Sequence, residues 1–328
     1  IKAALEKRGE GHRKVILVPE SAHGTNPATA AFAGFSVEDI PADADGRVDT
    51  AALKARLGPD VAGVMITNPN TCGLFERDLK TISEAVHAAG GYVYCDGANF
   101  NAIVGRVRPG DLGVDAMHIN LHKTFSTPHG GGGPGSGPVV FSERLTPFAP
   151  LPFVEKQGDH FVIVEEETAQ DHHADSFGRM TAFHGQMGMF TRALTYILSH
   201  GADGLRQVAE DAVLNANYVL RSLDDVLDAP FAASGPCMHE AIFSDRGFAE
   251  GFSTIDVAKA LIDEGFHPMT MYFPLVVHGA MLVEPTETES KATLDQFIGA
   301  LRSVAEGARA GDETLRTAPH FAPRSRLD

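Results

Sequence analysis

Short apolar runs alternate with helical patterns over residues 15–142. Continuous apolar runs predict buried strands at 15–18, 61–67, 93–95, 117–119 and 139–141. Residues 29–35 and 79–89 have the spacing of helices, and the glycines at 90 and 91 end the second of these. Apolar strands separated by helices are typical of βαβ units. We therefore predict an α/β fold with a mostly parallel sheet flanked by helices on both faces.

The pattern changes after residue 143. Residues 144–180 combine prolines with a polar cluster and predict a long irregular stretch, of the kind that is often functional. Residues 181–226 are predicted to be helical, with a break at His200 and Gly201. Beyond them, strands predicted at 238–243 and 280–283 alternate with helices predicted at 257–264 and 293–308. We expect a large domain over 1–200 and a smaller C-terminal α/β domain over 201–328.

Composition narrows the class of protein. The formal net charge of −16 over 328 residues argues against a nucleic-acid binder, because nothing offsets phosphate repulsion. No apolar run is long enough for a membrane span, and the charged start does not look like a signal peptide, so we expect a cytoplasmic protein with no membrane association. The three cysteines are too scattered for a disulfide framework. Because the first residue is Ile and not Met, we expect a fragment or a trimmed chain.

Polar side chains follow several of the predicted strands. In parallel sheets, ligands bind beyond the carboxyl ends of the strands, and His23, Thr67, Asp96 and Lys123 all lie at or just past such ends. An Asp at one strand end and a Lys after the next strand suit a pyridoxal-phosphate enzyme, in which the Lys amine forms the Schiff base and the Asp holds the pyridine nitrogen protonated. The apolar strand before Lys123 and the glycine-rich turn after it predict a part-buried amine. The alternative for Lys123 is a solvated surface lysine, and the alternative for Asp96 is a helix N-cap or a turn carboxylate.

Further side chains could surround such a ring. Ala98 is small enough to lie against one face, and the flat imidazole of His23 could stack on the other. The alternative for His23 is a structural histidine. His122 and Thr67 could hydrogen-bond the phosphate or the ring hydroxyl, which is a weaker assignment.

Other ligand chemistries fit less well. The glycine run at 130–137 is followed by no Lys-Ser/Thr and does not open a helix after the first strand, so neither a P-loop nor a dinucleotide turn is predicted. Such glycines let a backbone approach a ligand or partner closely. His118 and His122, and the cluster at 171–175, raise the alternative of zinc. His118 lies in a predicted strand, where residues four apart are far from each other, so we expect no metal site.

Five segments together resemble a known family. These are SAHGTNP (21–27), DGAN (96–99), NLHKTF (120–125), the glycine run at 128–135 and VEPTE (283–287). They resemble the P-protein of the glycine cleavage system, a glycine decarboxylase and fold-type-I pyridoxal-phosphate enzyme. SFGRMTAFHG (176–185) is similar to the C-terminal-half (β) subunit of the two-subunit form. The resemblance implies Lys123 as the Schiff-base lysine, Asp96 as the pyridinium partner and His23 as the stacking residue.

The resemblance also implies an activity and partners. The expected reaction is decarboxylation of glycine, with transfer of the aminomethyl group to the lipoyl arm of the H-protein. The expected assembly is a hetero-oligomer with an α subunit, for which apolar segments at 187–190 and 268–273 could serve, unless they are ordinary core. Two alternatives stay open: another fold-type-I amino-acid decarboxylase or aminotransferase, and a non-catalytic scaffold subunit. The presence of both Lys123 and Asp96 argues against a scaffold.

Overall fold

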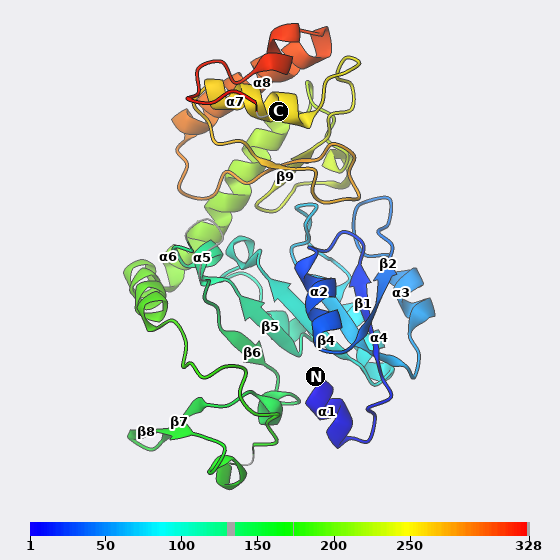
Figure 1. Ribbon diagram of the computed structural model, residues 1–328, viewed down its shortest axis with the longest axis vertical. Coiled ribbons are helices and arrows are strands. Elements are labelled where there is room, and N and C mark those ends of the chain that lie inside the picture. The colour runs from blue at the N-terminus through cyan, green and yellow to red at the C-terminus, as the bar shows by residue number, and fades with distance from the viewer. Residues whose placement is uncertain (130–134, 173, 327–328) are drawn as a thin grey trace.

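The computed structural model describes residues 1–129, 135–172 and 174–326 and centres on a six-stranded sheet (Figure 1). The strand order is β2-β1-β3-β4-β5-β6; the first five run parallel, and β6 is antiparallel to β5. The mostly parallel sheet predicted from the apolar runs is confirmed. The strands are β1 (Val15–Pro19), β2 (Ser36–Ile40), β3 (Val61–Thr67), β4 (Tyr92–Gly97), β5 (Ala116–Ile119) and β6 (Val139–Phe141).

Helices cover both faces of this sheet, as expected. On one face, α3 (Thr50–Arg56) and α4 (Leu79–Ala88) bury apolar side chains against the strands. On the other face lie α1 (Lys2–Lys7) and α2 (Thr25–Phe32). The helix predicted over 29–35 therefore begins four residues earlier, directly after the loop that carries His23.

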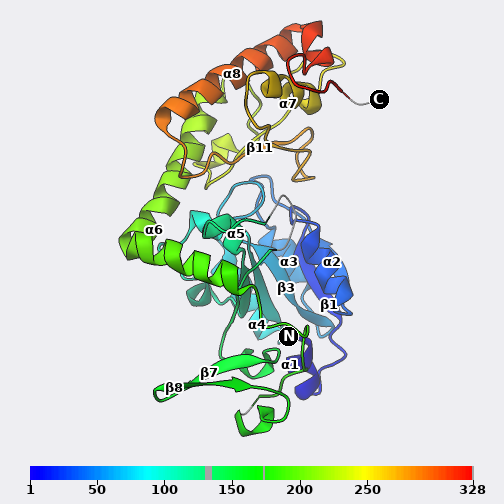
Figure 2. The same ribbon diagram turned by 60° about the vertical axis from the view of Figure 1, so that its left-hand side comes forward.

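A β-hairpin occupies part of the stretch predicted to be irregular. β7 (Phe153–Gln157) pairs antiparallel with β8 (His160–Val164). Figure 2 shows it at the end of the molecule remote from the C-terminus. Its apolar residues are largely exposed, for example Phe161 at 70%. The prediction of a wholly irregular stretch is wrong here, because FVEKQ and HFVIV pair as a hairpin although prolines lie just before them at 147, 150 and 152.

One long helix joins the large sheet to the C-terminal part (Figure 2). α6 (Met187–Leu223) is interrupted at Gly201, whose φ of 63° and ψ of −173° are not helical. The break predicted at His200 and Gly201 is confirmed, and glycine tolerates this positive φ without the steric cost that a side chain would add. The C-terminal half of α6 buries Val219, Leu220 and Leu223 in the C-terminal core. The domain boundary expected at residue 200 stays a prediction.

The C-terminal part has its own small sheet and core. The sheet order is β10 (Thr270–Met271), β11 (Met281–Val283), β9 (Ala241–Phe243), all antiparallel. α7 (Thr254–Asp263) and α8 (Lys291–Ala310) pack on it around the fully buried Phe243. The strand predicted at 238–243 is observed only at 241–243, as β9. Residues 238–240 precede the small sheet and face the large domain.

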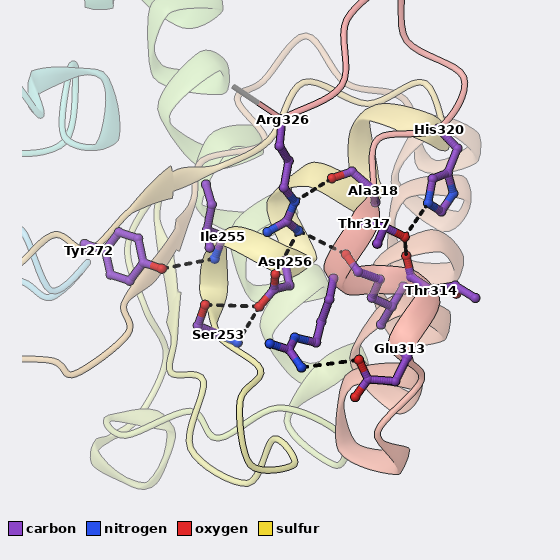
Figure 3. Close-up of polar contacts among 12 residues, drawn as sticks. Ser253, Ile255, Asp256, Tyr272, Glu313, Thr314, Thr317, Ala318, His320 and Arg326 are labelled. Carbon is purple, nitrogen blue, oxygen red and sulfur yellow. Dashed lines mark hydrogen bonds and ion pairs between the residues drawn. The ribbon is translucent and has the colours of Figure 1, made fainter. Parts of the chain in front are cut away.

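The C-terminal segment closes on α7 (Figure 3). The guanidinium of Arg326 donates to Asp256 Oδ1 at 2.8 Å, and to the carbonyl oxygens of Ala318 at 2.8 Å and Leu315 at 3.0 Å. Asp256 also accepts from the backbone N–H of Ser253 in a capping box at the start of α7. This tail therefore stabilises the helix that covers the C-terminal sheet.

The remaining elements are short turns. Single turns of 3-10 helix lie at Phe100–Ala102, Pro109–Leu112, Thr146–Phe148, Ala169–His172, Ala232–Ser234 and Glu313–Thr317. Cys72, Cys95 and Cys237 are buried and unpaired. Within the described ranges, no helix has the length and apolar character needed to cross a membrane. The glycine run at 130–134 and His173 of the 171–175 cluster lie outside the described residues.

Candidate active site

The predicted site residues gather at one edge of the large sheet. Thr67 and Asp96 are cross-strand partners at the carboxyl ends of β3 and β4, and Asp96 is in turn opposite His118 of β5. Lys123 follows β5 on the single turn α5 (Leu121–Thr124), and His23 follows β1. Parallel strands bring their carboxyl ends to the same edge, so the topology places these side chains on one side of the sheet.

Asp96 sits in a buried hydrogen-bond network. It is 5% exposed and accepts from the backbone N–H of Ala98 at 2.9 Å. His118 Nε2 lies 3.2 Å from Asp96 Oδ1, and His118 Nδ1 lies 2.7 Å from the Tyr94 hydroxyl. Burial, reinforced by the nearby Asp96 charge, raises the pKa of Tyr94 and keeps its hydroxyl protonated. Tyr94, His118 and Asp96 therefore form a continuous chain that orients the carboxylate. Neither Tyr94 nor His118 was predicted as part of the site.

Lys123 is exposed, so the expectation of a part-buried amine is wrong. The turn α5 ends after one turn and leaves Lys123 on its solvent side. Buried polar atoms lie on the same loop: His122 Nδ1, Thr124 Oγ1 and Thr127 Oγ1 have no hydrogen-bond partner within the described part of the chain. Burial, followed by the neighbouring His129, lowers the pKa of His122 and favours its neutral form. Unpartnered polar atoms around an amine fit the binding of a polar group such as pyridoxal phosphate.

His23 and Thr67 differ in accessibility. His23 is exposed; its Nδ1 accepts from the backbone N–H of Thr25 at 3.1 Å, and its ring meets Phe273 edge-on with centroids 5.5 Å apart. Thr67 is 4% exposed, and its hydroxyl accepts from Asn26 Nδ2 at 3.4 Å. Ala98 is half-buried beside Asp96. His23 thus lies between the two parts of the molecule, whereas Thr67 is part of the sheet edge itself.

The C-terminal part adds a charged cluster that was not predicted. His239 and Glu240 directly precede β9, and Glu284 directly follows β11, its antiparallel neighbour. His239 Nε2 lies 3.6 Å from Glu240 Oε2 and 3.9 Å from Glu284 Oε1. His239 is fully buried, and neither ring nitrogen has a hydrogen-bond partner within the described residues. The only signal for this cluster was VEPTE, which carries Glu284.

Specific contacts hold this cluster against the large domain. Asn101, just after β4, donates through Nδ2 to Glu284 Oε1 at 3.1 Å. The backbone N–H of Met238 donates to the carbonyl oxygen of Gly73 at 2.7 Å. Gly73 has a φ of 73°, and a Cβ there would lie 2.1 Å from the carbonyl oxygen of Glu240, so no larger residue fits without movement. The C-terminal strand ends therefore meet the edge of the large sheet that carries Asp96 and Lys123.

Among the described residues, ligand atoms of the kind that bind metals gather at this cluster. His239, Glu240 and Glu284 offer ligand atoms within 4.8 Å of one another. In contrast, His118 is engaged with Tyr94 and Asp96, and His172 contacts Glu155. The expectation of no metal site stays a prediction.

Comparisons with known proteins agree with the sequence resemblance. The aminotransferase class-V family model matches residues 2–227, and a model of the glycine dehydrogenase C-terminal domain matches residues 208–320. Proteins described as probable glycine dehydrogenase (decarboxylating) subunit 2 match all of this chain. The one from Caulobacter vibrioides is 66% identical and the one from Listeria innocua 50% identical. The chain spans 63% and 66% of their lengths, respectively.

Solved structures share the fold. A crystal structure of glycine decarboxylase (P-protein) of the glycine cleavage system, in inhibitor-bound form, superposes with a TM-score of 0.75 at 23% identity, covering 92% of this chain and 67% of that one. A sphingosine-1-phosphate lyase from Burkholderia pseudomallei gives a TM-score of 0.68 at 15% identity, covering 95% of this chain and 67% of that one. The predicted fold-type-I architecture is confirmed. Since a family model covers well over half of its length, the chain belongs to the aminotransferase class-V family.

Proposed function

We propose that this chain carries the pyridoxal-phosphate site of a two-subunit glycine decarboxylase of the glycine cleavage system. The observation that carries the proposal is the placement of Asp96 at the carboxyl end of β4 and of Lys123 just after β5, its parallel neighbour, in a fold-type-I sheet. The subunit-2 names of relatives that are up to 66% identical support glycine as the substrate.

The side chains have separate roles in this proposal. Lys123 supplies the amine that holds the cofactor covalently. Asp96 accepts the hydrogen bond of the protonated pyridine nitrogen, and His118 and the Ala98 N–H keep its carboxylate oriented. Bound pyridoxal 5'-phosphate supplies the electron sink for the electron pair that remains when CO2 leaves glycine.

The remaining residues shape the ring pocket. His23 would stack on one face of the cofactor ring, and Ala98 would leave room on the other. His122, with an unpartnered Nδ1, contacts the phosphate or the ring hydroxyl, and Thr67 lies at the same edge. His23 is exposed, and in this structure its ring meets Phe273 edge-on while its Nδ1 accepts from the backbone N–H of Thr25.

The partners follow from the same proposal. Glycine is the small substrate, and the lipoyl arm of the H-protein accepts the aminomethyl group. The name subunit 2 of the relatives supports a hetero-oligomer with a partner (α) subunit. The apolar segment at 187–190 supports this assembly, because Met187 is 70% and Phe190 38% exposed. The segment at 268–273 supports it less, because Met269 is buried and Tyr272 is its only largely exposed aromatic or aliphatic residue.

A second apolar surface fits the same partner subunit. A cavity of about 660 Å³ lies beside α2 and the edge strand β6. It is lined mostly by apolar side chains, including Phe32, Phe141, Phe177 and Met180, which are 91%, 37%, 58% and 67% exposed. Exposed apolar area of this kind is unusual in a monomer and is typical of protein interfaces.

The proposed function is tested with the purified protein, alone and mixed with the partner subunit. Visible absorbance on adding pyridoxal 5'-phosphate, followed by glycine-dependent exchange of labelled bicarbonate with added lipoylated H-protein, is the expected result. Absorbance with turnover that needs no H-protein would indicate another fold-type-I decarboxylase or aminotransferase. No absorbance in the assembled complex would favour a scaffold subunit. The cytoplasmic location expected from the sequence stays a prediction.

A further inference from the structure

One aromatic side chain of the C-terminal part reaches the proposed cofactor site. The ring of Phe273 meets the imidazole of His23 edge-on, with centroids 5.5 Å apart and the ring planes at 66° to each other. Aromatic pairs prefer such edge-on arrangements at centroid distances of about 4.5–7 Å. His23 belongs to the loop that follows β1, whereas Phe273 follows β10 of the small sheet. The contact therefore joins the two parts of the molecule.

Hydrogen bonds fix the loop that carries His23. Its carbonyl oxygen accepts from the backbone N–H of Asn26 at 3.0 Å, in the first turn of α2. The Thr71 hydroxyl donates to the carbonyl oxygen of Ser21 in the same loop. On the imidazole itself, Nδ1 accepts from the backbone N–H of Thr25 at 3.1 Å. Because the χ2 torsion of a histidine is broad, one hydrogen bond does not fix the plane of the ring, and a second contact is needed.

Phe273 can supply this second contact because it is held on the C-terminal sheet. Its half-buried side chain packs against an apolar cluster that includes Ile242 of β9 and Leu282 of β11. The loop that carries it is closed at its base, where the backbone N–H of Tyr272 donates to the carbonyl oxygen of Ala280 at 2.8 Å. The ring that meets His23 is therefore anchored on a regular element and not on a free loop.

Tyr272, directly before Phe273, has a strained backbone. Its φ of 57° lies in the left-handed region, which is costly for a residue with a bulky side chain. Its hydroxyl accepts from the backbone N–H of Ile255 at 3.1 Å, at the start of α7 (Figure 3). Such conformations persist only where surrounding contacts hold them, and they cluster at functional sites. The turn that presents Phe273 is thus maintained against a local cost.

We propose that Phe273 is a positioning residue that sets the plane of the His23 imidazole for stacking on the cofactor ring. The inference rests on the proposed role of His23 as the stacking residue. The Thr25 N–H holds one atom of the imidazole, and Phe273 holds the ring against rotation about that atom. Because Phe273 comes from the C-terminal part, the orientation of His23 depends on the docking of that part on the large domain.

Three variants separate positioning from docking. Phe273→Leu keeps apolar bulk but removes the flat ring, whereas Phe273→Tyr keeps the ring. Phe231→Leu is the matched control, because Phe231 packs on the same apolar cluster and also contacts the large domain, where a Cβ at Gly46 would lie 2.7 Å from its ring. Weaker docking would affect the Phe231 and Phe273 variants alike, whereas loss of positioning affects Phe273→Leu alone.

The first measurement is nuclear magnetic resonance of the protein without cofactor. Ring protons of His23 and Phe273 should show a nuclear Overhauser effect in the wild type, with the histidine signals assigned through His23→Gln. Phe273→Leu should shift the His23 ring signals, because a neighbouring aromatic ring changes their magnetic environment, and Phe231→Leu should not. Absence of the effect in the wild type would overturn the proposal even if a variant failed to fold, and so would unshifted signals in Phe273→Leu.

The second measurement uses the protein loaded with pyridoxal 5'-phosphate, in complex with its partner subunit. Phe273→Leu should weaken cofactor binding several-fold, up to about tenfold, the size of one edge-on aromatic contact, and should reduce the circular dichroism of the visible band. Phe273→Tyr should restore both. In a His23→Ala background, Phe273→Leu should have no further effect, because it acts through His23.

Two outcomes with the loaded protein would overturn the proposal. One is an equal effect of Phe273→Leu with and without the His23 imidazole. The other is an equal effect of Phe231→Leu and Phe273→Leu, which would reduce Phe273 to a docking contact. A wild-type complex with no visible band would refute the proposed function instead, while the His23 ring signals of the cofactor-free protein would still decide whether Phe273 orients the imidazole.

Discussion

Glu76 provides a quantitative test of how the loop beneath the site is built. It is 2% exposed and lies at the end of the loop that follows β3 and carries Gly73. Its Oε1 accepts from Asn70 Nδ2 at 2.7 Å, and its Oε2 accepts from the backbone N–H of Val48 at 3.2 Å. Burial raises the pKa of Glu76 to about 7, although these hydrogen bonds oppose the shift.

The sign of the effect on stability follows from linkage. The unfolded chain releases this proton near pH 4.5, whereas the folded protein keeps it to about pH 7. Between these values the folded state binds more protons, so the contribution of Glu76 to the free energy of unfolding falls as the pH rises. The full loss above pH 7 is about 3 kcal/mol, from 1.36 kcal/mol for each unit of the shift.

Glu76→Gln removes the titration but supplies one oxygen acceptor where Glu76 uses two. The lost hydrogen bond costs about 1 kcal/mol. We therefore expect the variant to be about 2 kcal/mol more stable than the wild type at pH 8 and up to about 1 kcal/mol less stable at pH 5. Urea unfolding at the two pH values measures this, with the exposed Glu84→Gln on α4 as the control. If the difference in free energy of unfolding between Glu76→Gln and wild type were the same at both pH values, Glu76 would not be protonated in the folded protein.

Three further predictions address the site, the contact of the C-terminal part with the Gly73 loop, and the C-terminal core. Asp96→Asn should keep the cofactor bound but slow bicarbonate exchange by on the order of 10²–10⁴, because the pyridinium loses its anionic partner; near-normal turnover would remove Asp96 from the site. Gly73→Ala places a Cβ 2.1 Å from a backbone carbonyl oxygen of the C-terminal part, so the amide of Met238 should exchange its hydrogen faster; unchanged exchange would contradict a tight contact. Phe243→Ala should lower the free energy of unfolding by about 3–5 kcal/mol, whereas Phe321→Ala, 86% exposed, should change it little.

The large sheet was predictable because its central strands are buried on both faces. β1 and β3 are buried at every residue, so they appear in the sequence as unbroken apolar runs. β2 was missed for the opposite reason: it is an edge strand with the sequence SVEDI, in which only Ile40 is buried. The hairpin of β7 and β8 is mostly exposed and packs on little, so its pattern carried no comparable signal.

The candidate site likewise contains residues that the sequence could place and residues that it could not. Asp96 and Lys123 could be placed at one edge because parallel strands fix where their carboxyl ends lie. The sequence could not place the cluster of His239, Glu240 and Glu284 at this edge. Its position depends on the direction that α6 takes after Gly201, because α6 carries the small sheet to the edge of the large sheet. The accessibility of Lys123 also depends on this packing, which local sequence does not encode.

The identity of the reactive amine can be measured by reduction and mapping. After incubation with pyridoxal 5'-phosphate, borohydride should fix one phosphopyridoxyl group on the protein, and peptide mass spectrometry should find it on Lys123. Lys123→Ala should carry no such adduct and show no visible absorbance band. A stoichiometric adduct on another lysine, or one that persists in Lys123→Ala, would show that Lys123 is not the cofactor-binding residue.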